Sequence, residues 1–280
     1  MQPQTKISKA FISLFLVIIM MFSVMSVGVN AYAVTPKISY VPDVRYDSAA
    51  VQSSSVVTPE LIEYLRSELV KTPESVDVRD FNISLTEVEE VCNYIYDSMP
   101  EFFHIEYMQY SYSGANIIAL YPVYNCTADE YTAMYNKCIA SAEKILSGIK
   151  DNDGLSDVQK ALLIHDRLAV KCEYDSKNLA IGIIPDSSYS MYGAIVDGVA
   201  VCQGYSEAYL YLLDKVGIKS YLCESSKLFH AWNIVVIDGK EYHVDVTWDD
   251  PVNDVTGRVL HTNFLRSSTG IYNTGHDAND

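Results

Sequence analysis

The stretch LFHAWNIVVIDGKEYHVDVTWDDP, residues 228–251, predicts a β-hairpin in the second half of the chain. Two runs rich in Val, Ile, Tyr and Trp flank Asp238 and Gly239, a dipeptide that tolerates the positive φ angles of a two-residue type I′ turn. Such a turn sets the register of the hairpin, with Ile237 opposite Lys240.

That register places a histidine and a carboxylate on one face. Counting outward sets Trp232 opposite Asp245 and His230 opposite Thr247, so that His230 and Asp245 become diagonal neighbours whose side chains are able to meet. The opposite face carries an apolar set that a core requires, namely Val235, Ile237, Val244, Val246 and Trp248. We therefore expect the polar face to look outward or into a cleft. Because a lone His and Asp also form simple ion pairs, a functional interpretation needs a third residue.

The first 33 residues have the features of an export signal. Lys6 and Lys9 precede the apolar run 10–29, and residues 31–33, Ala-Tyr-Ala, form the small-x-small pattern of a signal peptidase site. We expect cleavage after this pattern and a secreted, extracellular protein. The alternative is an uncleaved leader that anchors the protein in the membrane through residues 10–29, since this run is nearly long enough to span a bilayer.

The chain is strongly acidic, and this charge excludes two classes of partner. It has 36 acidic and 20 basic residues; without residues 1–33, which contain two lysines and no acid, 18 basic and 36 acidic residues remain, a formal net charge of −18. Nucleic acid and anionic lipid are poor partners for such a charge. We expect a protein or peptide partner, and a membrane contact only if the leader is uncleaved.

Six cysteines in an exported chain are consistent with three disulfides, or with one reactive thiol and at least one more unpaired cysteine. They are Cys92, Cys126, Cys138, Cys172, Cys202 and Cys223. No CxxC or HxxxH spacing is present, so we expect no metal site and no cofactor.

The remaining chain divides into a linker and two folded regions. Residues 34–57 are polar and punctuated by proline, as in an exported linker. Residues 58–150 are expected to form a mainly helical α+β region without identifiable chemistry. Its helix starts are expected at Thr58-Pro59, at a capping box from Thr86 to Glu89 and at a second from Thr127 to Glu130, and its hairpin around Ser113-Gly114. Residues 151–280 form the second region.

A helix capped by Ser156 and Gln159 opens the second region. His165 lies in the middle of its apolar stripe, and we assign this residue to the core rather than to catalysis. Two groups of aspartates could suggest calcium, but their spacing favours a solvated linker and an acidic loop. These groups are Asp151, Asp153 and Asp157, and Asp249, Asp250 and Asp254.

The third residue is Cys202. After Gly198 the chain turns, and from Cys202 onward apolar residues keep helical spacing until Gly217. A cysteine at a helix N-terminus is stabilised as a thiolate by the positive end of the macrodipole. Cys202, His230 and Asp245 then supply a nucleophile, a general base and an orienting carboxylate.

Three segments resemble the transglutaminase-like superfamily of cysteine enzymes. They are GVAVCQGYSEAYLYLLDKVGI (198–218), HAWNIVVIDGKEYHVDVTWDDP (230–251) and the helix containing IHDRL and CEYD, and the resemblance spans residue 155 to about residue 263. Papain-like enzymes share the chemistry but place the histidine far downstream and use Asn. The resemblance implies Cys202 as nucleophile, His230 as base and Asp245 as orienting residue. It also implies an α+β fold with a papain-like core, in which the Cys-bearing helix packs on an antiparallel sheet.

Around these three residues the sequence leaves several roles open. The oxyanion donor is expected from the backbone N–H of Cys202 together with the side chain of Tyr192 or Gln203. Trp232 is expected either to shield the ion pair from water or to serve as plain packing.

The resemblance implies an exported enzyme that cleaves or transfers the acyl group of protein or peptide amides through a cysteine thioester, with a peptidase or amidase favoured. Two alternatives are a protein-glutamine cross-linking transglutaminase and a non-catalytic binding module of the same fold.

Overall fold

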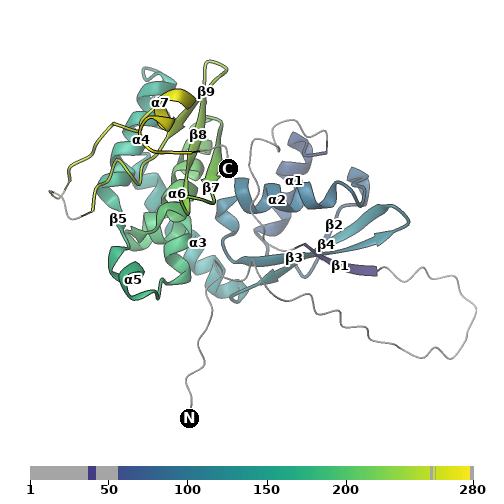
Figure 1. Cartoon of the computed structure of the whole chain (residues 1–280). Coiled ribbons are helices and arrows are strands. Elements are labelled where there is room, and N and C mark those ends of the chain that lie inside the picture. The colour runs from purple at the N-terminus through teal and green to yellow at the C-terminus, as the bar shows by residue number, and fades with distance from the viewer. Residues whose placement is uncertain (1–36, 42–55, 253–254, 256, 278–280) are drawn as a thin grey trace, which may run out of the picture.

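The computed structural model describes residues 37–41, 56–252, 255 and 257–277. The expected leader and its cleavage site lie outside the described residues. Within the described part of the chain, no helix is long and apolar enough to cross a membrane. The fold is α+β, as expected, and Figure 1 shows two groups of elements side by side.

The first group is a four-stranded antiparallel sheet, in the order β1-β3-β4-β2, covered by two helices. Its elements are β1 (Lys37–Val41), α1 (Pro59–Leu69), β2 (Val76–Asp77), η3 (Arg79–Phe81), α2 (Val88–Ser98), η4 (Pro100–Phe102), β3 (Ile105–Ser113) and β4 (Asn116–Tyr124). The β3-β4 hairpin turns between Ser113 and Asn116, where it was expected. Strand β1 pairs with β3 and lies inside the segment expected to be an irregular linker.

The helix starts of this group follow the predicted capping residues with one exception. Thr58 caps α1 through its side chain. The capping box predicted at Thr86 is wrong, because α2 begins at Val88 and the side chain of Glu87 instead accepts hydrogen bonds from the backbone N–H and hydroxyl of Ser84. Ser84 has the same Ser-x-x-Glu spacing, and its backbone is already held by a bridge to β4.

The second group surrounds a central helix. Its elements are α3 (Ala128–Ile145), α4 (Asp157–Lys171), β5 (Glu173–Tyr174), α5 (Ser176–Ile181), η5 (Asp186–Tyr189), η6 (Gly193–Asp197), β6 (Val199–Ala200), α6 (Cys202–Asp214), β7 (Ser220–Ser225), β8 (His230–Ile237), β9 (Lys240–Val244) and α7 (Ser268–Tyr272). Capping boxes open α3 at Thr127 and α4 at Ser156, as predicted. From Cys138 onward, the buried face of α3 packs into the core of this second group.

Helix α6 packs against the antiparallel sheet β7-β8-β9, and this contact forms the core of the second group. The buried side chains of α6 include Tyr205, Ala208, Tyr209, Leu212 and Leu213, and those of the hairpin include Val235, Ile237, Val244 and Val246. Apolar burial of this extent is the main stabilising contribution in a domain of this size. The result is the expected arrangement of a Cys-bearing helix on an antiparallel sheet.

Arg66 joins the two groups of elements. Its guanidinium lies 3.0 Å from the carboxylate of Glu101, which is buried, and 3.1 Å from the carboxylate of Asp214 at the end of α6. Burial raises the pKa of Glu101, while the charge of Arg66 opposes that shift. Breaking the pair with the buried Glu101 would leave an uncompensated charge, so this pair fixes α1 against η4, while the partly exposed pair with Asp214 links α1 to the end of α6.

Candidate active site

Cys202 is the first residue of α6 and is partly exposed. The chain reaches it through Gly198, whose φ of 72° lies in the left-handed region and where a Cβ would come within 3.0 Å of the Lys171 carbonyl oxygen. Extended backbone at Val201 then leads directly into the helix. The thiol therefore lies where unpaired backbone N–H groups and the helix dipole favour a thiolate.

The β8-β9 hairpin has the predicted turn and the predicted register. Asp238 and Gly239 have φ angles of 51° and 72°, and Ile237 pairs with Lys240. The pairing ends at Asn233 and Val244, so the predicted pairing of His230 with Thr247 is wrong. Beyond β9 the chain turns instead, because the backbone N–H of Trp248 donates a hydrogen bond to Oδ1 of Asp245 at 3.0 Å.

The histidine and the aspartate nevertheless meet. Nε2 of His230 donates a hydrogen bond to Oδ2 of Asp245 at 2.7 Å. The Cys202 thiol also interacts with this imidazole, and since Nε2 is occupied by Asp245, Nδ1 is the nitrogen left for the thiol. Asp245 is fully buried, so its face of the hairpin does not look into solvent.

The charges of this row stabilise one another. Burial alone lowers the pKa of His230, but the hydrogen bonds and charges of Asp245 and Cys202 outweigh burial and raise it to about 9. Burial alone raises the pKa of Asp245, but hydrogen bonds from His230, His276 and the Trp248 backbone hold it below its usual value. An imidazolium at neutral pH beside a cysteine is the condition for a thiolate-imidazolium pair.

His276 is a site residue that the sequence did not predict. Its Nε2 donates to Oδ2 of Asp245 at 2.7 Å, and its Nδ1 lies 3.0 Å from the hydroxyl of Thr274. It follows Asp245 by 31 positions and comes after α7, so no hairpin or helix periodicity links the two residues.

Two tryptophans cover the His230 ring. Trp232 is fully buried and stacks on the imidazole at 5.8 Å, as expected for a residue that excludes water, and its Nε1 donates to His243. The prediction that Trp248 lies on the core face is wrong. Its side chain is 38% exposed and stacks on the imidazole at 5.0 Å, because the chain leaves the strand at Asp245.

The two side chains expected as oxyanion donors are engaged elsewhere. The ring of Tyr192 packs against Phe103 at 5.9 Å, and the amide of Gln203 donates to Glu207 at 2.9 Å. The phenol of Tyr174 lies near the reacting atoms, since the charges of Cys202 and Asp245 act on it. Burial, followed by these charges, raises the pKa of Tyr174 to about 12, so its hydroxyl keeps its proton at neutral pH.

A cavity of ≈ 480 Å³ opens beside His230. Its lining residues include Tyr174, Thr247, Trp248, Val252, Leu260 and Asn263. This volume is within the usual range for small-molecule and side-chain pockets.

All six cysteines are thiols in the structure, and four of them are buried. Three disulfides are therefore not formed, and the alternative of a reactive thiol stands. Cys202 is the cysteine that the fold places beside a histidine of the hairpin.

His165 is fully buried in α4, as expected for a core residue, but it belongs to a polar cluster. Its Nε2 lies 3.3 Å from Oδ2 of Asp249. Asp249 lies in the acidic loop after β9, as predicted, but its side chain is fully buried and accepts hydrogen bonds from the backbone and side-chain amides of Asn263.

Comparisons with known proteins give similarities to solved structures. No protein-family model matches the sequence, and no curated protein matches it. The chain is similar to a solved "TGase" with a TM-score of 0.36 and 14% identity, over 54% of this chain and 46% of that one. It is also similar to a "Putative Cysteine Protease from Cytophaga hutchinsonii" with a TM-score of 0.30 and 16% identity, over 50% of this chain and 57% of that one. The chain thus spans about half the length of each structure.

Proposed function

We propose that this protein is an exported cysteine enzyme that cleaves or transfers the acyl group of protein or peptide amides. The observation that carries the proposal is the row of three residues beside a cavity, in which His230 is hydrogen-bonded to Asp245 and interacts with Cys202. A peptidase or amidase is favoured, because the Cys202 thiol is partly exposed and water reaches it directly.

The reaction begins with attack of the Cys202 thiolate on the carbonyl carbon of an amide. The backbone N–H of Cys202 and the hydroxyl of Tyr174 stabilise the oxyanion that develops. The imidazolium of His230 then gives its proton to the leaving nitrogen, the C–N bond breaks and a thioester remains. Asp245 holds the imidazole in place and stabilises its cationic form.

The second half of the reaction decides the class of product. A water molecule or an amine attacks the thioester carbon and gives a proton to His230, and the C–S bond breaks to release the thiolate. Water yields hydrolysis, whereas a lysine amine yields a cross-link.

Exposed apolar side chains near the site support a protein or peptide substrate. Phe229, directly before His230, is 91% exposed, and the cavity-lining Trp248 and Val252 are 38% and 47% exposed. Large apolar groups exposed around a cavity are typical of a surface that binds another chain.

Product analysis tests the proposal. The purified protein is incubated with a mixture of denatured proteins, with and without a primary-amine probe, and the products are analysed by mass spectrometry. We expect new termini or deamidated glutamines without the probe, and none with Cys202→Ala. Incorporation of the amine in preference to hydrolysis would assign a transglutaminase, and an unchanged mixture in every channel would favour a binding module.

Export is a separate part of the proposal and rests on residues 1–33. N-terminal sequencing of the protein recovered from its native host is expected to begin at Val34. An intact Met1 in the membrane fraction would instead identify residues 10–29 as an anchor.

A further inference from the structure

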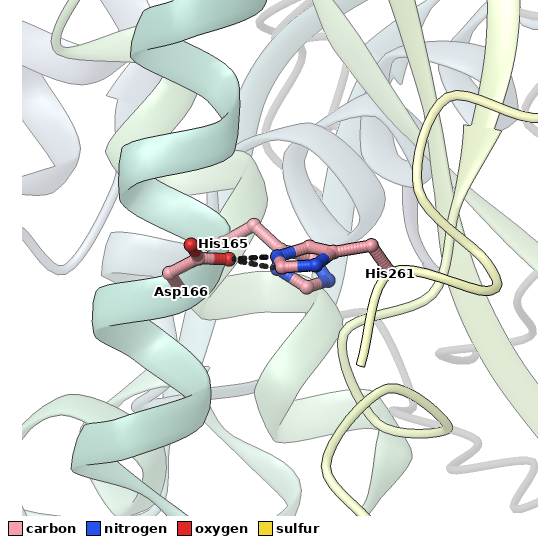
Figure 2. A group of neighbouring side chains, drawn as sticks. All are labelled: His165, Asp166 and His261. Carbon is pink, nitrogen blue, oxygen red and sulfur yellow. Dashed lines mark hydrogen bonds and ion pairs between the residues drawn. The ribbon is translucent and has the colours of Figure 1, made fainter. Parts of the chain in front are cut away.

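Outside the proposed active site, two imidazoles converge on one carboxylate oxygen. Nδ1 of His165 lies 2.9 Å from Oδ1 of Asp166, and Nε2 of His261 lies 2.7 Å from the same oxygen. Figure 2 shows the two rings approaching Asp166 from one side, one from α4 and the other from the loop that follows β9. An ion pair between a histidine and an aspartate needs only one imidazole nitrogen. Here His261, which lies 95 positions from Asp166 in the chain, supplies a second.

We propose that His165, Asp166 and His261 form a binding site for a divalent transition-metal ion, with Zn²⁺ as the best fit. Their three ligand atoms lie within 4.8 Å of one another. Two imidazole nitrogens and one carboxylate oxygen are ligands that zinc uses in open sites, with water in the fourth position. Calcium and magnesium prefer sites built of oxygen ligands, and the two nitrogens disfavour them.

The surroundings of His165 match the second layer of a zinc site. Ligating histidines usually donate their other ring N–H to a carboxylate, which sets the tautomer. Nε2 of His165 faces the fully buried Asp249 at 3.3 Å and has no well-formed hydrogen bond there. Asp249 is itself fixed by the backbone and side-chain amides of Asn263. A neutral His165 that ligates through Nδ1 would direct its proton to Asp249.

The charges of the cluster fit a dication. Asp166 and Asp249 carry two negative charges, and among the described residues neither forms an ion pair with Lys or Arg. The ionic partners of these two carboxylates in the described part of the chain are histidines alone. A bound Zn²⁺ would balance the two carboxylates while the imidazoles stay neutral.

The site has an apolar inner side and an open outer side. Rings of Tyr209 and Phe264 pack on His165, whose side chain has no exposed surface. The side chains of Asp166 and His261 are 36% and 47% exposed. Tetrahedral coordination at about 2.0–2.2 Å separates ligand atoms to about 3.3 Å, so the two surface ligands would move apart by about half an ångström.

Metal binding there would hold one wall of the cavity. His261 lies between Leu260 and Thr262, which line the cavity beside His230. A metal bond from His261 to α4 would therefore fix this loop in the position that shapes the cavity. The proposal concerns metal binding and stands whether or not the enzyme function is correct.

Titration of chelator-stripped protein with Zn²⁺ tests the proposal. The Cys202→Ser background is used, because a thiol beside His230 offers a competing zinc site. We expect one tightly bound zinc per chain by calorimetry and a rise of several degrees in melting temperature. With Co²⁺ as the probe, we expect the visible absorption of a tetrahedral site without a thiolate charge-transfer band.

Matched variants locate the metal. His261→Gln and Asp166→Asn should each weaken zinc binding by at least about tenfold. Asp151→Asn, which removes an exposed carboxylate outside the cluster, should leave the affinity unchanged. Both cluster positions are partly exposed, so we expect folded proteins, checked by their melting curves. Absence of zinc and cobalt binding, or binding that survives His261→Gln, would overturn the proposal and leave an ion-pair cluster.

Discussion

Nε2 of His276 lies 2.7 Å from Oδ2 of Asp245, the same carboxylate oxygen that the imidazole of His230 contacts. Oδ1 of Asp245 is held by the backbone N–H of Trp248. With both oxygens fixed, the buried carboxylate is not free to rotate away from His230. We therefore interpret His276 as a positioning residue that acts through Asp245.

Replacement of His276 tests this role. His276→Ala should lower kcat by about 10- to 100-fold with a smaller change in KM, because the orientation of His230 is loosened while the cavity is preserved. His276→Gln, which retains an N–H donor at a similar reach, should recover part of the loss. Steady-state kinetics give the comparison, and equal rates for the alanine variant and the parent would exclude a positioning role.

Thiol labelling tests the reactivity of Cys202. Iodoacetamide should modify it first near neutral pH, because it lies at a helix start beside an imidazolium. Burial raises the pKa of Cys138 and Cys172 to about 12, so these thiols should react slowly. Cys126 is the internal control, since it is also partly exposed but its pKa is raised by burial and by a nearby glutamate. Mass analysis over time should show Cys126 trailing Cys202; equal rates would count against the assignment.

Tyr174→Phe tests the proposed oxyanion contact. Loss of the hydroxyl should lower kcat by roughly tenfold or more while the ring continues to line the cavity. Tyr192→Phe is the matched control, because the Tyr192 ring packs against Phe103 and does not line the cavity, and this variant should retain the parental rate. A Tyr192→Phe enzyme that loses as much activity as Tyr174→Phe would instead support Tyr192, one of the two side chains predicted from the sequence, as the oxyanion donor.

The raised pKa of His230 predicts a pH dependence of stability. The folded-state pKa is about 9 against an ordinary value of 6.5, so the folded protein binds this proton more tightly than the unfolded chain. The resulting stabilisation is fully present below about pH 6.5 and is lost as the pH rises through about 9. Denaturant unfolding should show a steeper decline over this range for the parent than for His230→Gln. Parallel declines would place the pKa near its ordinary value.

The sequence predicted the helix that begins at Cys202 and the hairpin that carries His230 and leads to Asp245. Local chemistry is sufficient for that step: a positive-φ dipeptide at Asp238 and Gly239 sets the hairpin register, and helical spacing after Gly198 puts the cysteine at a helix start. The α+β core and the packing of a Cys-bearing helix on an antiparallel sheet were implied by the family resemblance. These features depend on residues close together in the chain.

Contacts between residues far apart in the chain were not predicted from the sequence and are seen in the tertiary structure. His276 reaches Asp245, and His261 reaches Asp166, through irregular segments that have no periodicity to read. The turn after Val244 likewise places Trp248 on His230 rather than on the core face. The strand was expected to continue there, but the backbone N–H of Trp248 instead donates a hydrogen bond to the side chain of Asp245. Strand and helix periodicities describe repeating backbone, and where the backbone stops repeating, the position of a side chain depends on the packed surface that receives it.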